Sequence, residues 1–209
     1  ESNCLYFHLS FDNLSYVNMC RVILLILASL PTFAQTHLPI ATNFRKSYLT
    51  HVRMRDGLPG KNSWQNRSDY SIRVRFSPET RQVSGHVNIR YFNNSPDTLS
   101  QLVFKLYPNL YKTESIRNKP IAKDDLGDGV DIESIVIGGQ YVDSKRVSIR
   151  GTNMIVQGVT IQPDTKLDIE INYSYRLNKG SFTRTGQVDA GAFVVAYFFP
   201  RIAVYDDID

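Results

Sequence analysis

The chain has 209 residues, of which 42% are hydrophobic and 21% charged, with a formal net charge of +4. These values are typical of a globular protein and exclude a chain that is disordered throughout. The basic residues are scattered along the sequence, so nucleic-acid binding is not expected. The 12 Tyr and 11 Phe residues favour β-strands, because aromatic side chains fit a pleated, half-buried surface.

The N-terminal part has the layout of a secretory signal. Arg21 precedes an apolar run from Val22 to Leu30, and Pro31 and small residues follow it. A short basic start, a short apolar centre and a small residue at the cut define such signals, so cleavage is expected after Ala34. The run is too short to span a bilayer, which takes about 20 apolar residues. A buried hydrophobic helix or strand is the alternative.

The signal interpretation sets the expected boundaries. If translation starts at Met19, residues 1–18 are a spurious or unstructured leader and residues 19–34 are the signal peptide. We then expect a periplasmic or extracellular protein with no stable membrane span after cleavage. Both cysteines, Cys4 and Cys20, precede the cut, so the mature part has no disulfide and no cysteine nucleophile or metal ligand.

Residues 35–63 are predicted to be a loop-rich lead-in with one short helix, because the turn formers between Asp56 and Gly60 interrupt any longer pattern. From residue 64 to 209 the pattern changes to strands, and the domain is expected to be truncated at its C-terminus. Apolar and polar residues alternate with the period of a half-buried strand. The predicted strands lie at 70–76, 83–91, 102–106, 132–137, 141–142, 147–149, 154–156 and 167–175.

Two further segments complete this pattern. Residues 112–130 are polar and rich in turn formers, which predicts a long loop. The apolar run from Phe193 to Phe199 shows no alternation, which predicts a strand buried on both faces. The fold class that follows is all-β: an antiparallel β-sandwich or a saddle-like set of several sheets, after a signal-peptide helix and the lead-in.

A search for catalytic or metal-binding chemistry yields no complete site. His8, His37, His51 and His86 have no second ligand at metal-binding spacing. The acidic group Asp124, Asp125, Asp128 and Asp131 has calcium-loop composition without the spacing of an EF-hand, and a solvated acidic loop is the favoured reading. Asp206 and Asp207 are paired carboxylates that suit either acid–base chemistry or a turn. We therefore predict no catalytic, cofactor-binding or metal residue in the chain.

Three Asn-x-Ser sequences offer possible glycan attachment sites in a eukaryotic secretory host. They begin at Asn66, Asn93 and Asn172. Nothing in the sequence identifies the host.

Four stretches, in order, resemble the N-terminal β domain of aminopeptidase N-like (gluzincin) zinc metallopeptidases of the secreted bacterial type. They are Trp64–Tyr70, Gly85–Leu99, Leu102–Asn109 and the aromatic-Pro stretch Phe198–Asp207. The resemblance implies a saddle-like β domain that packs against a following thermolysin-like catalytic domain and helps to shape its peptide-substrate pocket. It also implies zinc in the parent protein, bound by that second domain, whose G-x-M-E-N and H-E-x-x-H motifs are absent here.

In that family a Gln or Glu of the first domain often contacts the free amino terminus of the substrate. The stretch Ala190–Phe199 has neither residue, and Gln187 is only a neighbouring candidate. No catalytic or metal residue is therefore transferred to this chain. The candidates for an interdomain or substrate-entry surface are Tyr107, Tyr111, Phe193 and Tyr197, with plain core packing as the alternative.

Two other functions stay open at this stage. A stand-alone extracellular β-sandwich for adhesion or carbohydrate binding would also explain the strands, the aromatic residues and the export signal. A scaffold or membrane-associated relative that kept the fold and lost zinc is the third.

Overall fold

The computed structural model describes residues 39–180 and 184–208. The predicted leader, signal peptide and cleavage site lie outside these residues, as do Cys4, Cys20, His8 and His37. The chain divides into two compact units, Glu1–Ala41 and Thr42–Asp209.

The lead-in contains the short helix that the sequence predicts, α2 (Thr42–Leu49). Its buried residue is Ser47, and the half-buried Phe44 and Tyr48 lie on the same side at helical spacing. A series of tight turns follows, closed by an isolated bridge between Arg53 and Pro59. Residues 42–63 thus belong to the same compact unit as the β domain.

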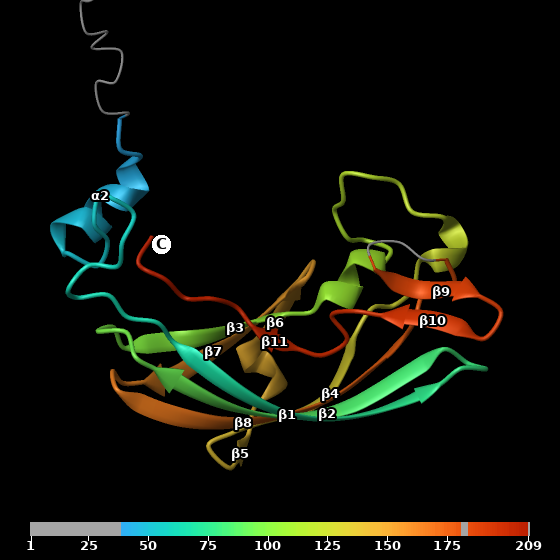
Figure 1. The fold of residues 1–209 in the computed structure, drawn as a ribbon. Coiled ribbons are helices and arrows are strands. Elements are labelled where there is room, and N and C mark those ends of the chain that lie inside the picture. The colour runs from blue at the N-terminus through green and yellow to red at the C-terminus, as the bar shows by residue number, and fades with distance from the viewer. Residues whose placement is uncertain (1–38, 181–183, 209) are drawn as a thin grey trace, which may run out of the picture. The chain divides into compact units, whose positions relative to one another are not determined.

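The larger sheet has five antiparallel strands in the order β1-β2-β8-β4-β5. Its strands are β1 (Arg67–Ser77), β2 (Gln82–Asn93), β4 (Asp131–Ile137), β5 (Gln140–Tyr141) and β8 (Thr165–Arg176). Strands β2 and β8 pair over their whole length and form the centre of the sheet (Figure 1). The sequence predicted a strand in each of these regions. In β2 and β8 buried positions alternate with exposed or half-buried ones, which the alternating pattern reflects, whereas both residues of β5 are exposed.

The second sheet has four strands in the order β11-β3-β7-β6. They are β3 (Leu99–Lys105), β6 (Val147–Arg150), β7 (Asn153–Ile161) and β11 (Arg201–Ile202). A two-stranded ribbon joins β9 (Thr185–Asp189) to β10 (Ala192–Val195). Three short 3-10 helices complete the structure: η1 (Tyr107–Tyr111), η2 (Lys123–Asp125) and η3 (Ser144–Arg146).

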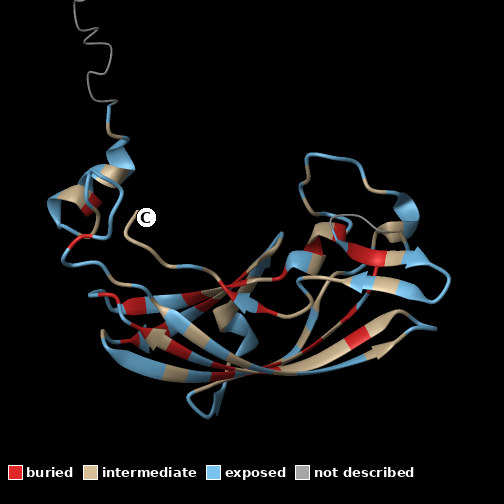
Figure 2. Cartoon of the chain, viewed as in Figure 1, coloured by how far each residue is buried: buried red, intermediate tan, exposed pale blue. Residues whose placement is uncertain are grey.

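One apolar core joins the two larger sheets. The inward side chains of β2 and β8 belong to the same buried cluster as those of β3 and β7. Examples from the four strands are Ile89, Phe104, Val156 and Ile171, each at most 1% exposed. Figure 2 shows the buried positions along these strands. The all-β, multi-sheet fold class predicted from the sequence is therefore confirmed, and the predicted loop at 112–130 contains only η2.

The apolar run at 193–199 differs from the prediction. Only its first residues belong to a strand, β10, whose side chains alternate between exposed and half-buried. β10 pairs with β9 alone, so it is not a central strand buried on both faces. The prediction failed because the run is apolar for another reason: its rings pack against rings of β1 and η1.

In the part of the chain that the structure describes, no helix has the length and apolar character needed to cross a membrane.

Candidate functional site

The candidate site is a set of paired aromatic rings, here called the aromatic surface. It comprises Tyr70, Phe76, Tyr107, Phe193, Tyr197, Phe198 and Phe199. Phe193 packs edge-on against Phe76 at a centroid distance of 4.9 Å, and Phe199 against Tyr70 at 5.4 Å. Tyr197 lies 5.0 Å from Tyr107. Each contact joins the segment 193–199 to β1 or to η1, in the edge-on or tilted arrangements that aromatic pairs prefer.

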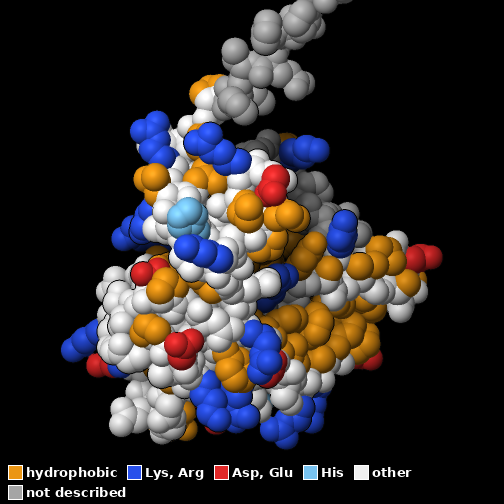
Figure 3. Space-filling model, turned by 60° about the vertical axis from the view of Figure 1, so that its left-hand side comes forward, with side chains coloured by type: hydrophobic (Ala, Val, Ile, Leu, Met, Phe, Trp, Pro, Cys, Tyr) orange, Lys and Arg blue, Asp and Glu red, His pale blue; other side chains and the backbone are white. Residues whose placement is uncertain are grey.

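This surface is only partly covered. Tyr107 is 38% exposed and Tyr197 41% exposed. Val74 lies on the same face of β1 as Tyr70 and Phe76, opposite Gly85 of β2, and is 49% exposed. The core-facing side of the edge strand β1 therefore remains accessible at this position. Figure 3 shows hydrophobic side chains gathered in a broad, hollowed area on one face of the molecule.

A cavity of about 140 Å³ opens beside the Tyr107–Tyr197 pair. Its walls are predominantly apolar and come from η1 and from the segment after β10; they are formed by Tyr107, Pro108, Leu110, Tyr111, Thr152, Thr185, Ala196 and Tyr197. Tyr197 has a positive φ of 58°, a backbone conformation uncommon for residues other than glycine.

The four aromatic residues predicted for an interdomain or substrate-entry surface do not all lie at one place in the structure. Tyr107, Tyr111 and Tyr197 line one cavity, and Tyr111 is itself buried at 7% exposure. Phe193 packs on Phe76 instead. Gln187, on β9, donates a hydrogen bond from its side-chain amide to the carbonyl of Asp189. Gln187 does not line this cavity.

The predicted acidic group does not converge on a cation site. Asp125 accepts a hydrogen bond from the backbone N–H of Gly180 at 2.6 Å, which ties the long loop to the segment that follows β8. Asp124 and Asp128 are exposed. Among the described residues no group of three or more His, Cys, Asp or Glu side chains could hold a metal ion. The donor set of this segment therefore does not fit zinc or calcium.

Of the two described histidines, His51 is exposed in the lead-in. His86 lies on the outer face of β2, where its ring nitrogens contact the side-chain oxygens of Asn172 at 2.8 Å and Asn88 at 3.1 Å. This is a polar cross-strand ladder of the kind that stabilises sheets.

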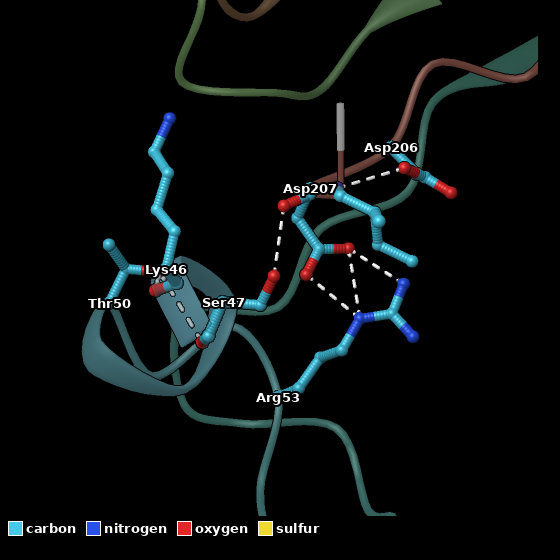
Figure 4. Close-up of polar contacts among 7 residues, drawn as sticks. Lys46, Ser47, Thr50, Arg53, Asp206 and Asp207 are labelled. Atoms are coloured by element: carbon cyan, nitrogen blue, oxygen red, sulfur yellow. Dashed lines mark hydrogen bonds and ion pairs between the residues drawn. The ribbon is translucent and has the colours of Figure 1, made fainter. Parts of the chain in front are cut away.

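The paired carboxylates near residue 207 have a structural role. Asp207 accepts hydrogen bonds from Nε and an Nη of Arg53, each at 2.8 Å at its shortest (Figure 4). Its carbonyl accepts a further bond from the hydroxyl of Ser47 at 2.9 Å. The Arg53 guanidinium holds the pKa of the Asp207 carboxyl at about 2, well below its usual range. Asp206 caps its own turn by accepting from the N–H of Ile208.

The Asn-x-Ser sequences are also engaged in the fold. Asn93 is fully buried, and its amide donates to the carbonyls of Asp97 and Ile161. Asn66 donates to the Tyr91 hydroxyl at 2.8 Å, and Asn172 donates to Ser134. The complete burial of Asn93 leaves no room for a glycan at that residue in the folded domain.

Comparison with known proteins gives matches among solved structures. No family model and no curated protein sequence matches the chain. A structure of an M1 zinc metallopeptidase from Deinococcus radiodurans is similar at 16% identity and a TM-score of 0.39, over 62% of this chain and 25% of that one. A mutant of an M1 zinc metallopeptidase from the same organism, bound to a Tyr-Ser-Ala substrate, is similar at 14% identity and a TM-score of 0.38, over 59% of this chain and 23% of that one.

A two-domain M1 zinc metallopeptidase mutant bound to L-arginine gives 14% identity and a TM-score of 0.40, over 64% of this chain and 26% of that one. The chain therefore spans about a quarter of the length of these structures.

Proposed function

We propose that this chain is the non-catalytic N-terminal β domain of an exported zinc aminopeptidase-like metallopeptidase. In this proposal it packs against a thermolysin-like catalytic domain of the same protein and forms part of the wall of the peptide-substrate pocket. Zinc belongs to that second domain, since the described residues here supply no ligand group.

The aromatic surface is the observation that carries the proposal. Exposed apolar side chains that cluster on one face usually mark an interaction site. Within this surface Tyr107 is 38% exposed and Tyr197 41% exposed, and the neighbouring Val74 of β1 is 49% exposed. The segment that builds the surface runs directly into the Phe198–Asp207 stretch, one of the four that resemble the peptidase family. Aromatic residues are also enriched in the buried core of protein–protein interfaces, relative to the rest of the protein surface.

The geometry supports a wall and not a catalytic centre. The cavity beside Tyr107 and Tyr197 has room for about one side chain, and no titratable residue other than tyrosine lines it. General acid–base catalysis most often uses a His side chain, and also Glu, Asp or Lys, and the described residues that line this cavity include none of these four types. The domain can therefore contribute shape and apolar contact.

The coding sequence that follows residue 209 is the first test. The G-x-M-E-N and H-E-x-x-H motifs should occur within roughly the next hundred residues. Absence of both would overturn the proposal. A stop codon directly after Asp209, with glycan binding by the purified domain, would favour the stand-alone binding module instead.

The second test uses the full-length enzyme. Y197A should lower kcat/KM for peptide substrates about tenfold, because truncating a contact at the pocket wall removes substrate interactions. Y141A is the matched control, since Tyr141 is 80% exposed on the short strand β5. Zinc content should be unchanged in both variants. Equal activity of Y197A and the parent would exclude a role of this surface in the pocket. Zinc-dependent hydrolysis by residues 35–209 alone would contradict the non-catalytic assignment.

A further inference from the structure

The lead-in carries almost all of the net charge of the described domain. Between residues 42 and 63 there are five basic side chains and one acidic side chain. From residue 64 to 209 there are 18 basic and 17 acidic side chains, which nearly cancel. The basic residues are scattered over the whole sequence, but only in this short segment are they not balanced by acidic residues. Such asymmetry marks a surface for an anionic partner.

Four of these five basic side chains are available to a partner. Arg45, Lys46, Arg55 and Lys61 are exposed, and none forms an ion pair with any residue that the structure describes. The fifth, Arg53, is held by Asp207. The ion pair attaches the lead-in to the segment that contains Asp207. The other four basic side chains face solvent.

Large aliphatic side chains accompany these cations. Leu49 is 74% exposed, Leu58 60% and Met54 48%. Leu49 lies at the end of α2, four residues after Arg45 and three after Lys46, so the three share one side of the helix. The opposite side holds Phe44, Ser47 and Tyr48, which face the domain.

The remaining two aliphatic residues flank a tight turn. The N–H of Met54 donates to the carbonyl of Leu58 at 3.0 Å, and the N–H of Gly57 donates to the carbonyl of Met54 at 3.1 Å. Arg55 lies at the tip of this turn. The arrangement holds Met54, Arg55 and Leu58 close together and exposed. Figure 3 shows basic and hydrophobic side chains interleaved on the upper part of the face in view.

From this charge and exposure pattern, we propose that residues 42–61, within the lead-in, form a docking surface for an anionic lipid bilayer. The lipid phosphates pair with Arg45, Lys46, Arg55 and Lys61, while Leu49, Met54 and Leu58 enter the boundary between headgroups and acyl chains. Segments that lie in the membrane interface combine bulky apolar residues, which enter the boundary between headgroups and acyl chains, with basic residues, which are attracted to anionic lipids. The proposal does not depend on the peptidase assignment.

The aliphatic residues favour a bilayer over a nucleic acid. Nucleic-acid surfaces combine cations with aromatic rings on which bases stack, whereas the exposed apolar residues among these cations are Leu49, Met54 and Leu58. Acyl chains bury such side chains without a shaped pocket. Each Lys or Arg near an anionic leaflet adds roughly a fivefold gain in affinity.

The test is vesicle co-sedimentation of the whole chain. Vesicles of equal parts phosphatidylglycerol and phosphatidylcholine should bind the protein at least tenfold more tightly than vesicles of phosphatidylcholine alone. Binding should fall when salt is raised to about 0.5 M, because the Debye length then shrinks to a few ångströms. Equal binding to both vesicle types, or to neither, would overturn the proposal.

Two pairs of variants separate local docking from general charge. K46E/R55E should lose at least tenfold in affinity for the anionic vesicles. The control K166E/R150E makes the same change in net charge at exposed positions on β8 and β6 and should bind within about threefold of the parent. Equal losses in the two double variants would show that only the total charge matters, and would overturn the assignment of the site.

The aliphatic contact has its own variant. L49S/L58S should lose at least fivefold in affinity for anionic vesicles. V204S is the control, because Val204 lies outside the lead-in and is 79% exposed, and this variant should bind like the parent. Unchanged binding of L49S/L58S would overturn the proposed insertion of Leu49 and Leu58 into the bilayer. All substituted side chains are exposed, and an unchanged thermal midpoint in each variant confirms that the fold is intact.

Discussion

The guanidinium of Arg53 and the carboxylate of Asp207 form a bidentate ion pair, although the two residues are 154 positions apart in the sequence. Arg53 comes from the turns after α2, and Asp207 from the segment after β11. The shortest distance is 2.8 Å, with side-chain exposures of 39% for Arg53 and 12% for Asp207. Ser47 binds the carbonyl of the same aspartate, and Trp64 stacks on Tyr205 at 5.7 Å. These contacts attach the lead-in to the end of the β domain.

Arg53→Gln is expected to lower the free energy of unfolding by about 1 kcal/mol. The exposed arginine limits the contribution of the pair, while the nearly buried aspartate and the paired hydrogen bonds increase it. Equilibrium urea unfolding measures the change. Arg67→Gln removes a longer, fully exposed contact to Asp69 at 3.4 Å and should change stability by no more than a few tenths of a kcal/mol. Equal effects of the two substitutions would contradict the proposed role of Arg53.

The same pair predicts a dependence of stability on pH. The pKa of Asp207 is lowered to about 2 in the folded state, below the value of about 3.9 for an unfolded chain. The ionised carboxylate therefore adds stability that is fully present above about pH 4 and is lost as the pH falls towards 2. The parent should lose more stability across this interval than Asp207→Asn, which lacks the group.

Asp128→Asn is the control for this measurement, because Asp128 is exposed. Unfolding free energies at several pH values between 2 and 5 give the comparison. If the free energy of unfolding changes with pH in the same way for the parent and Asp207→Asn, the ionisation of Asp207 does not contribute to the pH dependence of stability.

The strands were predictable from the sequence because their signal is local. In β2 and β8 every second residue faces the core, and this period is visible in the letters. The run at 193–199 has no such period, and apolar content alone cannot show whether a segment lies inside a sheet or at its border. Its rings contact β1, more than 100 positions earlier in the chain, and no local pattern indicates that partner.

The functional contacts were less predictable for the same reason. The sequence singled out Asp206 and Asp207 as a pair, yet the partner of Asp207 is Arg53, which has no motif around it. Asn93 matches a glycan sequence, but its burial depends on how β2 meets the end of β7. The aromatic candidates Tyr107 and Tyr197 were identified from their type and from the family resemblance, and the structure shows that they meet in one ring pair.

Gly85→Ala is expected to destabilise the domain by about 2 kcal/mol. Gly85 pairs with Tyr173 across β2 and β8, and a Cβ at Gly85 would overlap the Tyr173 ring. Tyr173 is 1% exposed and cannot swing into solvent, so the core must shift, as in overpacked variants. Gly127→Ala is the control, since a Cβ there meets no atom within 4 Å. Thermal unfolding compares the two, and equal midpoints would show that the Tyr173 ring adjusts freely.

Asn93→Ala is expected to cost about 3 kcal/mol of unfolding free energy. The Asn93 amide donates to the carbonyls of Asp97 at 2.8 Å, Ile161 at 3.1 Å and Gln162 at 3.2 Å, and its oxygen accepts from the Ser95 hydroxyl at 2.6 Å. Removing it leaves several polar groups in or near the core without a partner, and each carries a desolvation penalty.

The control for Asn93→Ala is its neighbour. Asn94→Ala removes one exposed hydrogen bond, from the Asn94 amide to the carbonyl of Gln65 at 2.7 Å, and should cost about 1 kcal/mol or less. Urea unfolding of both variants gives the comparison. Asn93→Asp is a second variant with nearly the same shape: it keeps the oxygen that accepts from Ser95 and replaces the donating amide with an acceptor, so three carbonyls would face a carboxylate. It should therefore be at least as destabilising as Asn93→Ala at neutral pH, whereas a near-parental Asn93→Asp protein would show that the donated bonds contribute little.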